Sequence, residues 1–325
     1  MDYTTLGNTG LKVSVAGLGC GGNSRLGMRT GNTEAESIEI VRTAYDLGVN
    51  LFDTAEAYKT EPILGKALKG LDRDSFVLTT KANIGKADAP RSGEDILECL
   101  ENSLKNLQMD YVDVYQMHGV HPNRYDEVME NIVPSLQKAK QDGKIKHIGI
   151  TETSPNDPTH TMLERAVDEG VWEVMMLGYN MMNQTAREKV FPKVIDNKIG
   201  TLLMFVVRNI FSQPDYLRNT AQELASEGKI PAEFAEKDNP LDFLVHEGGA
   251  VNVTDAAYRF VRHEPGVNVV LFGTGKKAHL EANIASITSG PLPEDDVKKL
   301  YALFNSLVGV GFDLPDKGST VGVIK

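Results

Sequence analysis

The feature that most constrains this chain is an alternation of short apolar runs with longer amphipathic stretches, repeated eight times. The apolar runs are bulky on both sides, as residues 202–206 show (Leu-Leu-Met-Phe-Val), and such runs are typical of strands buried in a parallel sheet. Eight strand–helix units predict an α/β fold whose sheet closes into a (β/α)8, or TIM, barrel. We expect strands at residues 15–18, 49–53, 76–81, 112–118, 147–151, 174–177, 201–206 and 267–272.

Capping residues mark the expected helices. Thr33 followed by Glu36, and Ser92 followed by Asp95, have the spacing of a capping box at a helix N-terminus. Gly48 suits the C-terminal end of the first helix. We expect helices at residues 36–47, 61–68, 92–107, 125–142, 159–169, 185–197, 254–263, 278–288 and 294–307.

Three segments fall outside the eight units, and no linker separates them from the barrel. Residues 3–14 predict an N-terminal hairpin with its turn at residues 7–10. Residues 208–252, after strand seven, are too long for an ordinary connection and are expected to form a functional loop over the site. Residues 308–325 are expected to pack irregularly across the barrel mouth. The prediction is one domain, residues 1–325.

The composition narrows the classes of partner. The chain carries a formal charge of −11 and no long basic run, so nucleic acid and anionic membranes are poor partners. Its longest apolar run, residues 202–207, is far shorter than the ~20 residues of a membrane span. Cys20 and Cys99 form no disulfide framework, and the first residues lack the regions of a signal peptide. We therefore expect a cytoplasmic protein.

A glycine motif near the N-terminus invites a different fold. Residues 17–22 read G-x-G-x-x-G, the pattern of a Rossmann dinucleotide site. That site needs a helix opening at the third glycine and an acidic residue about 20 positions on, but no helix start follows Gly22 and Asp53 lies too far along. We expect instead that Gly21 and Gly22 follow a barrel strand and leave room for a bound group at the catalytic end.

Four polar residues form the candidate catalytic set. Asp53, Lys81 and His118 end the second, third and fourth expected strands, and Tyr58 follows in a loop. Strand ends on this rim of a barrel converge on one mouth. A nearby Lys81 ammonium is expected to lower the pKa of the Tyr58 phenol, and Asp53 is expected to hold the lysine. His118 is expected either to hydrogen-bond the substrate oxygen or to assist proton transfer. Each of the four residues alone could have an ordinary structural role. Four such residues at matching strand ends are much harder to explain by structural roles alone.

Several ordered motifs resemble the aldo-keto reductase family. They are Asn50–Tyr58 with Leu64–Leu68, then Leu100–Leu104 leading to His118, then Gly143–Ile150, then Gly178-Tyr179-Asn180. The resemblance runs from about Tyr3 to Ser306. It implies an NAD(P)-dependent oxidoreductase whose substrate is an aldehyde, ketone, sugar or the corresponding alcohol. It also implies that Asp53, Tyr58, Lys81 and His118 form the catalytic tetrad, with Tyr58 as the acid/base.

The family's nicotinamide anchor is altered in this sequence. Family members usually hold the carboxamide with Ser-Asn after strand five and Gln on strand six, and stack an aromatic ring from strand seven. The corresponding places read Thr151-Glu152, Met176 and Met204-Phe205. Thr151 keeps a hydroxyl, but ionised Glu152 cannot donate a hydrogen bond and Met176 is only a weak acceptor. Phe205 or Met204 is expected to cover the ring.

The phosphate end also departs from the family pattern. Members tight for NADP place Lys-Ser and then Arg around the 2′-phosphate, where this chain has Gly273-Thr274 and His279. Lys276 and Lys277 either compensate at the start of a helix, a natural phosphate site, or are simply solvated. The cofactor is therefore NADP or NAD, with NAD favoured slightly more than is usual in the family. We expect the cofactor to contact Gly21, Gly22, Thr151, Glu152, Met204, Phe205, Gly273, Thr274, Lys276, Lys277, His279 and, at the adenine, Asn283.

Three other functions compete with the reductase. Lys81 at a strand end permits a Schiff-base aldolase-type barrel. The altered carboxamide anchor permits a cofactor-binding sensor or regulatory barrel with little turnover. The H-x-x-H of His118 and His121 permits a metal-dependent hydrolase, but it lacks further ligands at recognisable spacing, so no metal site is predicted. The predicted partner is a small carbonyl or alcohol, and its identity, the direction of reaction and the oligomeric state carry no sequence signal.

Overall fold

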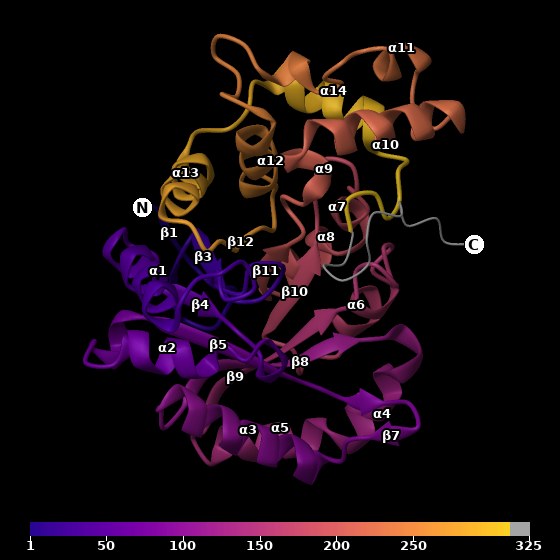
Figure 1. Cartoon of the computed structure of the whole chain (residues 1–325). Helices are drawn as coiled ribbons and strands as arrows, with labels where there is room; N and C mark the ends of the chain where they lie inside the picture. Colours follow the sequence, from indigo (N-terminus) through magenta and orange to yellow (C-terminus); the bar gives the residue numbers. More distant parts are fainter. Residues whose placement is uncertain (313–325) are drawn as a thin grey trace.

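The computed structural model describes residues 1–312. Its centre is a closed barrel of eight parallel strands in the order β10-β11-β12-β3-β4-β5-β8-β9, and helices surround the barrel (Figure 1). The predicted (β/α)8 fold is confirmed, and the expected strands differ from the observed ones only by a few residues at their ends. The barrel strands are β3 Ala16–Gly19, β4 Leu51–Asp53, β5 Val77–Asn83, β8 Val112–Val120, β9 Ile145–Glu152, β10 Val174–Gly178, β11 Gly200–Met204 and β12 Val269–Phe272.

The predicted helices are present, and both predicted capping boxes form at the starts of α1 and α3. Two expected helices are each broken in two, because Pro134 and Pro192 stand at the second residue of α5 and α8, and proline is tolerated in a first helical turn but not in a helix interior. The helices are α1 Glu34–Asp46, α2 Glu61–Leu68, α3 Gly93–Leu107, α4 Tyr125–Asn131, α5 Val133–Gln141, α6 Thr161–Ala166, α7 Ala186–Lys189, α8 Phe191–Asp196, α9 Asn209–Ser212, α10 Pro214–Ser226, α11 Ala232–Ala235, α12 Val253–Arg262, α13 Lys277–Thr288 and α14 Glu294–Phe304.

The N-terminal hairpin closes the amino end of the barrel. Strands β1 Tyr3–Thr5 and β2 Lys12–Ser14 pair antiparallel, as predicted. Leu6 and Val13 are fully buried and join the cluster of side chains that fills the barrel. With this end plugged, the carboxyl ends of the strands form the barrel's open face.

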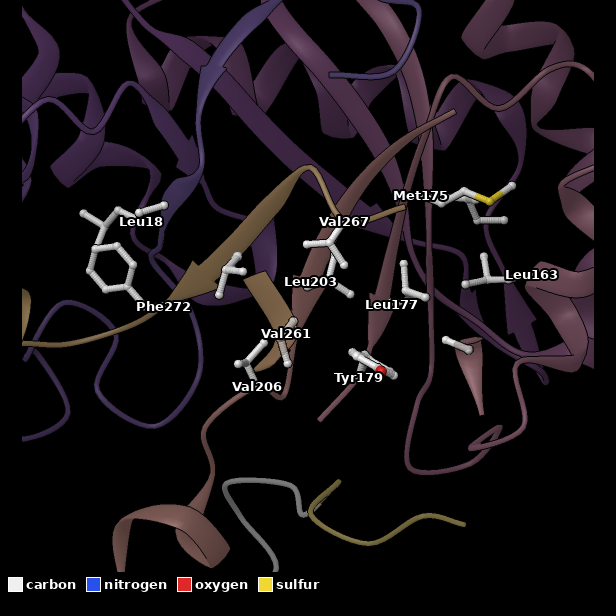
Figure 2. Close-up of a cluster of buried hydrophobic side chains, with 14 of the residues drawn as sticks. Leu18, Leu163, Met175, Leu177, Tyr179, Leu203, Val206, Val261, Val267 and Phe272 are labelled. Atoms are coloured by element: carbon white, nitrogen blue, oxygen red, sulfur yellow. The ribbon is translucent and has the colours of Figure 1, made fainter. Parts of the chain in front are cut away.

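A second and larger hydrophobic cluster lies between the barrel and its helices. Figure 2 shows part of it, where Leu177 of β10, Leu203 of β11, Phe272 of β12 and Val261 of α12 gather. These side chains are almost completely buried. The two clusters hold the strands rigidly, which fixes the positions of the residues at the strand ends.

The long segment after β11 is largely helical rather than an extended loop. It contains α9, α10, α11 and a short 3-10 helix at Asp242–Leu244. The ring of Phe234 in α11 lies 5.7 Å from that of Phe304 in α14, and α10, α11 and α14 lie together at one side of the molecule (Figure 1). Phe234 thus packs this segment against α14. That residues 208–252 serve as a functional segment over the site stays a prediction.

Residues after α14 return to the barrel mouth. The Asn180 side chain donates to the carbonyl of Val310 at 3.2 Å, and the Gly309 amide donates to Asn183 at 2.6 Å. Residues 309–312 therefore contact the loop after β10. The predicted passage of the tail across the mouth also concerns residues 313–325, which lie outside the described residues, and it stays a prediction. In the part of the chain that the structure describes, no helix is both long and apolar enough to cross a membrane.

Candidate active site

A buried ion pair lies at the centre of the open face. Lys81 of β5 is fully buried, and its Nζ lies 2.7 Å from each carboxylate oxygen of Asp53 and 2.7 Å from the carbonyl oxygen of Thr54. These partners account for all three donors of the ammonium. Asp53 also accepts hydrogen bonds from the Thr79 hydroxyl at 2.5 Å and the Gln116 amide at 3.4 Å. The pair is therefore fully hydrogen-bonded inside the barrel.

Tyr58 and His118 complete the set beside this pair. Tyr58 ends a short 3-10 helix, Glu56–Tyr58, and its Oη lies 3.2 Å from His118 Nε2. Lys81 Nζ lies 5.2 Å from the centre of the tyrosine ring. A Cβ on Gly21 would lie 2.5 Å from that ring, so only glycine leaves room for it. The structure thus brings together all four residues that were predicted from the sequence to be catalytic.

The pKa of Tyr58 moves opposite to our sequence prediction. Burial of the phenol raises its pKa above the ordinary value, and the nearby Lys81 and Arg25 offset this only in part. Lys81 does lower the pKa of Tyr58 as expected, but desolvation of the phenolate outweighs this attraction, so the net shift of the pKa is upward. Tyr58 is a neutral phenol at pH 7.

The two nitrogen bases differ in charge. Burial, together with the Lys81 ammonium, lowers the pKa of His118 to about 3, so its imidazole is neutral at pH 7. Burial alone would lower the pKa of Lys81, but Asp53 reverses this and the net shift is upward. The site therefore holds one fixed cation, one neutral imidazole and one neutral phenol.

Glu152, at the expected carboxamide anchor, is committed to internal partners. Its side chain is fully buried, and its carboxylate accepts from the Ser154 hydroxyl at 2.7 Å and from the Gly178 amide at 2.8 Å. Its other oxygen lies 2.7 Å from His160 Nδ1. Glu152 therefore ties the end of β9 to the end of β10 and to the following loop. Sequence reasoning missed the partners of Glu152, since none stands in a motif.

The other anchor positions also have partners within the fold. The Thr151 hydroxyl accepts from the Gly119 amide at 2.6 Å. Met176 belongs to the cluster inside the barrel, and Met204 packs against that cluster. Phe205 is half-buried with a positive φ of 62°, and its ring lies 5.4 Å from that of Phe312. Phe205 and Met204 were the two residues expected to cover a nicotinamide ring. Phe205 provides an aromatic ring at the barrel mouth, and Met204 does not.

The start of α13 has the properties of a phosphate site. No side chain caps its N-terminus, and Lys276, Lys277 and His279 there are exposed. The Thr274 hydroxyl instead accepts from the Lys276 amide at 3.0 Å, which shapes the turn into the helix. Uncapped amides with two lysines match a phosphate group in charge and in donors.

Glycines bring this turn close to the loop after β3. A Cβ on Gly275 would lie 2.3 Å from the Cα of Gly27, and one on Gly273 would lie 3.1 Å from the carbonyl oxygen of Gly19. Gly22, nearby in sequence, has a φ of 67° and open space around it. The turn before α13 and the loop after β3 are therefore in close contact.

A pocket of about 400 Å³ opens beside His118. It lies over the carboxyl ends of β5, β8 and β9, and we refer to it as the rim pocket. A smaller cleft of about 290 Å³ lies at the opposite end of the barrel, next to the hairpin. Among residues 1–312, no three histidine, cysteine or acidic side chains are grouped so that they could hold a metal ion.

A closed (β/α)8 barrel with an acid–base centre at the carboxyl ends of its strands has the architecture of a barrel enzyme. The model of the aldo/keto reductase family matches residues 17–304, and the chain belongs to this family. It is 31% identical to the aldo-keto reductase YhdN of Bacillus subtilis, over 95% of each chain. It is 28% identical to L-galactose dehydrogenase of Arabidopsis thaliana, over 89% of this chain and 88% of that one.

Solved structures agree on the fold. The aldo-keto reductase AKR11C1 of Bacillus halodurans, in its holo form, superposes with a TM-score of 0.69 at 22% identity and covers 92% of this chain and 96% of its own. The likeness to this structure supports the fold, and the family model with the curated relatives makes the protein an oxidoreductase of the aldo-keto reductase type.

Proposed function

We propose that this protein is an NAD(P)-dependent oxidoreductase that interconverts a small carbonyl compound (an aldehyde, ketone or sugar) and its alcohol, with Tyr58 as general acid/base. The observation that carries the proposal is the contact of Tyr58 Oη with neutral His118, 3.2 Å away, beside the fully bonded Lys81–Asp53 pair. A relative named L-galactose dehydrogenase supports keeping a sugar among the substrates.

The chain's own residues divide the acid–base work. Tyr58 holds a proton at Oη and delivers it to the substrate oxygen, or accepts it in the reverse direction. The Lys81 ammonium, 5.2 Å from the ring, stabilises the phenolate that forms, and Asp53 keeps that ammonium charged and in place. Neutral His118 can hydrogen-bond the substrate oxygen but cannot act as an acid at pH 7. A bound nicotinamide cofactor supplies or takes the hydride.

The described residues fit such a cofactor at its phosphate end. The uncapped start of α13 with Lys276 and Lys277 suits its phosphates, and Gly22 in the loop after β3 has open space around it. We therefore keep the expected cofactor residues, with NADP or NAD as the cofactor, but revise one role. Glu152 supports the site through its hydrogen bonds and is not a direct ligand of the carboxamide, since it is fully buried.

The Schiff-base alternative has an observation against it. A lysine nucleophile must lose its proton, but Lys81 has a raised pKa and three hydrogen-bonded partners. The sensor alternative retains one observation in its favour, which is that Thr151 and Glu152 are already occupied by other partners.

Cofactor titration combined with turnover tests the proposal. Trp172 is the only tryptophan, but it is buried, bonded to Tyr125 and located beside the cleft at the opposite end, so calorimetry is the better readout for NADH and NADPH. We expect one or both to bind, and we expect Tyr58→Phe to abolish turnover of a generic aldehyde while preserving binding.

The other outcomes separate the alternatives. Binding without turnover on a broad carbonyl and alcohol panel would replace the reductase by the sensor. Absence of binding by either cofactor would refute the oxidoreductase proposal.

A further inference from the structure

We propose that Glu56 is a positioning residue for Tyr58, because its carboxylate fastens the turn that carries the tyrosine to the strand that carries Lys81. This inference rests on the proposed function and assigns a role to a residue outside the four catalytic candidates. Glu56 does not line the rim pocket, so we expect it to act on the reaction through Tyr58 and not through contact with the substrate.

The turn that carries Tyr58 is short and needs support from outside. It is a 3-10 helix of three residues, Glu56–Tyr58, in which the Tyr58 amide donates to the Ala55 carbonyl at 3.0 Å. No side chain among residues 1–312 caps its N-terminus, and Lys59 directly after it has a positive φ of 63°. Hydrogen bonds in such turns have poorer geometry than those of an α-helix. The position of the tyrosine ring therefore depends on what holds this turn in place.

Glu56 supplies a contact from the turn to β5. One oxygen of its carboxylate accepts from the backbone amide of Asn83 at 3.2 Å and from the side-chain amide of the same residue at 3.1 Å. The same oxygen accepts from the Arg91 guanidinium, which also donates to the Asn83 carbonyl at 3.0 Å. Three donors thus converge on one carboxylate oxygen, and hydrogen bonds to an ionised acceptor are stronger than those between neutral groups.

Asn83 lies where the other catalytic candidates meet. It ends β5 two residues after Lys81, and it pairs with His118 in the ladder between β5 and β8. The contact with Glu56 therefore connects the turn of Tyr58 to the two strands that carry the ammonium and the imidazole. The distances of 3.2 Å from Tyr58 Oη to His118 Nε2 and 5.2 Å from Lys81 Nζ to the tyrosine ring both join this turn to these strands.

Threonines hold the two ends of the same segment. Thr54 Oγ1 lies 2.9 Å from Thr60 Oγ1, and the Thr60 hydroxyl donates to the Cys20 carbonyl at 3.2 Å. These contacts join the ends of the segment 54–60 and attach it to the chain after β3, whereas Glu56 attaches its middle to β5. We therefore expect removal of the Glu56 carboxylate to displace Tyr58 without unfolding the segment.

An electrostatic role for the carboxylate makes a different prediction. A nearby anion raises the pKa of a phenol, but burial, Lys81 and Asp53 have the largest influence on the pKa of Tyr58. Glutamine separates the two roles, because it keeps an oxygen for the donors of Asn83 and Arg91 and removes the charge. A positioning role tolerates Glu56→Gln and not Glu56→Ala, whereas an electrostatic role is lost equally in both variants.

The test compares the kinetics of these two variants with wild type. Reduction of a generic aldehyde is followed with the cofactor that binds, and the concentration of active protein is taken from the calorimetric binding stoichiometry. In Glu56→Ala we expect kcat to fall by at least ~30-fold, since a misplacement of about 1 Å can cost 10²-fold, while KM and the cofactor Kd change less than ~3-fold. In Glu56→Gln we expect kcat to stay within ~3-fold of wild type.

The pH profile of kcat gives a readout that a loss of stability does not move. A phenol held further from the Lys81 ammonium loses part of the attraction that stabilises its phenolate. We therefore expect the limb of the profile that reports Tyr58 to move to higher pH in Glu56→Ala, by ~0.5–1 unit, and to stay in place in Glu56→Gln.

Asn106→Ala is the matched control. Asn106 of α3 donates to the carboxylate of Glu61 in α2 at 3.2 Å, so the change removes a hydrogen bond to a neighbouring glutamate that does not hold the turn of Tyr58. We expect it to lower the urea midpoint and to leave kcat, KM and the pH profile unchanged. Arg91→Met removes one of the three donors to Glu56, and we expect it to lower kcat by ~3-fold.

The outcomes separate this inference from the proposed function. A wild-type kcat in Glu56→Ala refutes the positioning role and leaves the reductase standing, and if that variant does not fold, a wild-type kcat in Arg91→Met refutes it. Equal losses in Glu56→Gln and Glu56→Ala refute it in favour of the charge. A loss that Asn106→Ala matches also refutes it, as a general effect of stability. Absence of turnover in the wild-type protein refutes the proposed function, and this inference with it.

Discussion

Replacing Asp53 by asparagine tests whether the Lys81 charge depends on its partner. The change keeps the size of the side chain and an oxygen for the Thr79 hydroxyl, but it places an amide donor against an ammonium that is fully buried. Removing one partner of a buried ion pair typically destabilises a protein by about 3–5 kcal/mol. In Asp53→Asn we expect Lys81 to become a neutral amine in the folded state.

The pKa of lysine gives an independent value for the destabilisation caused by Asp53→Asn. Deprotonating a lysine of ordinary pKa 10.4 at pH 7 costs about 4.6 kcal/mol, at 1.36 kcal/mol per unit, which agrees with the range for a broken pair. The unfolded variant then binds one more proton than the folded one, so its stability rises with pH. The destabilisation relative to wild type should shrink by about 2.7 kcal/mol between pH 7 and pH 9.

Urea unfolding followed by circular dichroism at both pH values provides the measurement, with Asp53→Asn, Lys81→Met and the double variant. The double variant removes both charges, so we expect a stability much closer to wild type and a coupling energy of at least about 3 kcal/mol. Additive single effects, or a penalty in Asp53→Asn that does not change with pH, would show that the ion pair does not control the charge of Lys81.

Three further changes probe the site. Gly21→Ala pushes a methyl group into the Tyr58 ring, since the Cβ would lie 2.5 Å from it, and kcat/KM should fall by at least ~10-fold because small misplacements of catalytic groups are costly. The pKa of His118 is about 3 in the fold, against about 6.5 unfolded, so stability is lost as pH falls below about 6.5. Between pH 7 and pH 5, urea titrations should show wild type losing about 2 kcal/mol more than His118→Gln. Lys276→Ala with Lys277→Ala should raise the calorimetric Kd for the cofactor by ~10-fold and reduce its salt dependence, whereas an unchanged Kd would mean that these lysines are merely solvated.

The positions of the candidate catalytic residues were predictable because the geometry of a parallel barrel brings the ends of neighbouring strands together. Once the strands are recognised from their apolar runs, Asp53 and Lys81 must reach the same rim, and β4 and β5 pair directly. Neighbouring β5 and β8 likewise bring Lys81 and His118 to that rim. Apolar periodicity and the order of the strands can be read directly from the sequence. They can therefore be predicted without knowledge of tertiary contacts.

The electrostatics and the long segment could not be predicted in the same way. The pKa of Tyr58 depends on how much water the finished fold excludes, and no spacing of residues reports that depth. The segment of residues 208–252 has polar composition, yet Phe234 gains a partner in Phe304, about 70 positions further on. Contacts between residues so distant in sequence determine where such helices pack. Neither Phe234 nor Phe304 alone indicates its partner in the sequence.

Glu152 shows how a departure from a family pattern can be structural. A carboxylate in place of an amide would be costly to bury alone, and the structure supplies it with the Ser154 hydroxyl, the His160 imidazole and the Gly178 amide. His160 adopts a positive φ of 61° to make its contact, which is an uncommon conformation for a residue with a side chain. These hydrogen bonds of Glu152 connect the end of β9 to the end of β10 and to the loop that follows β9. The buried carboxylate therefore has all its partners within the fold, and a bound group is not needed to satisfy it.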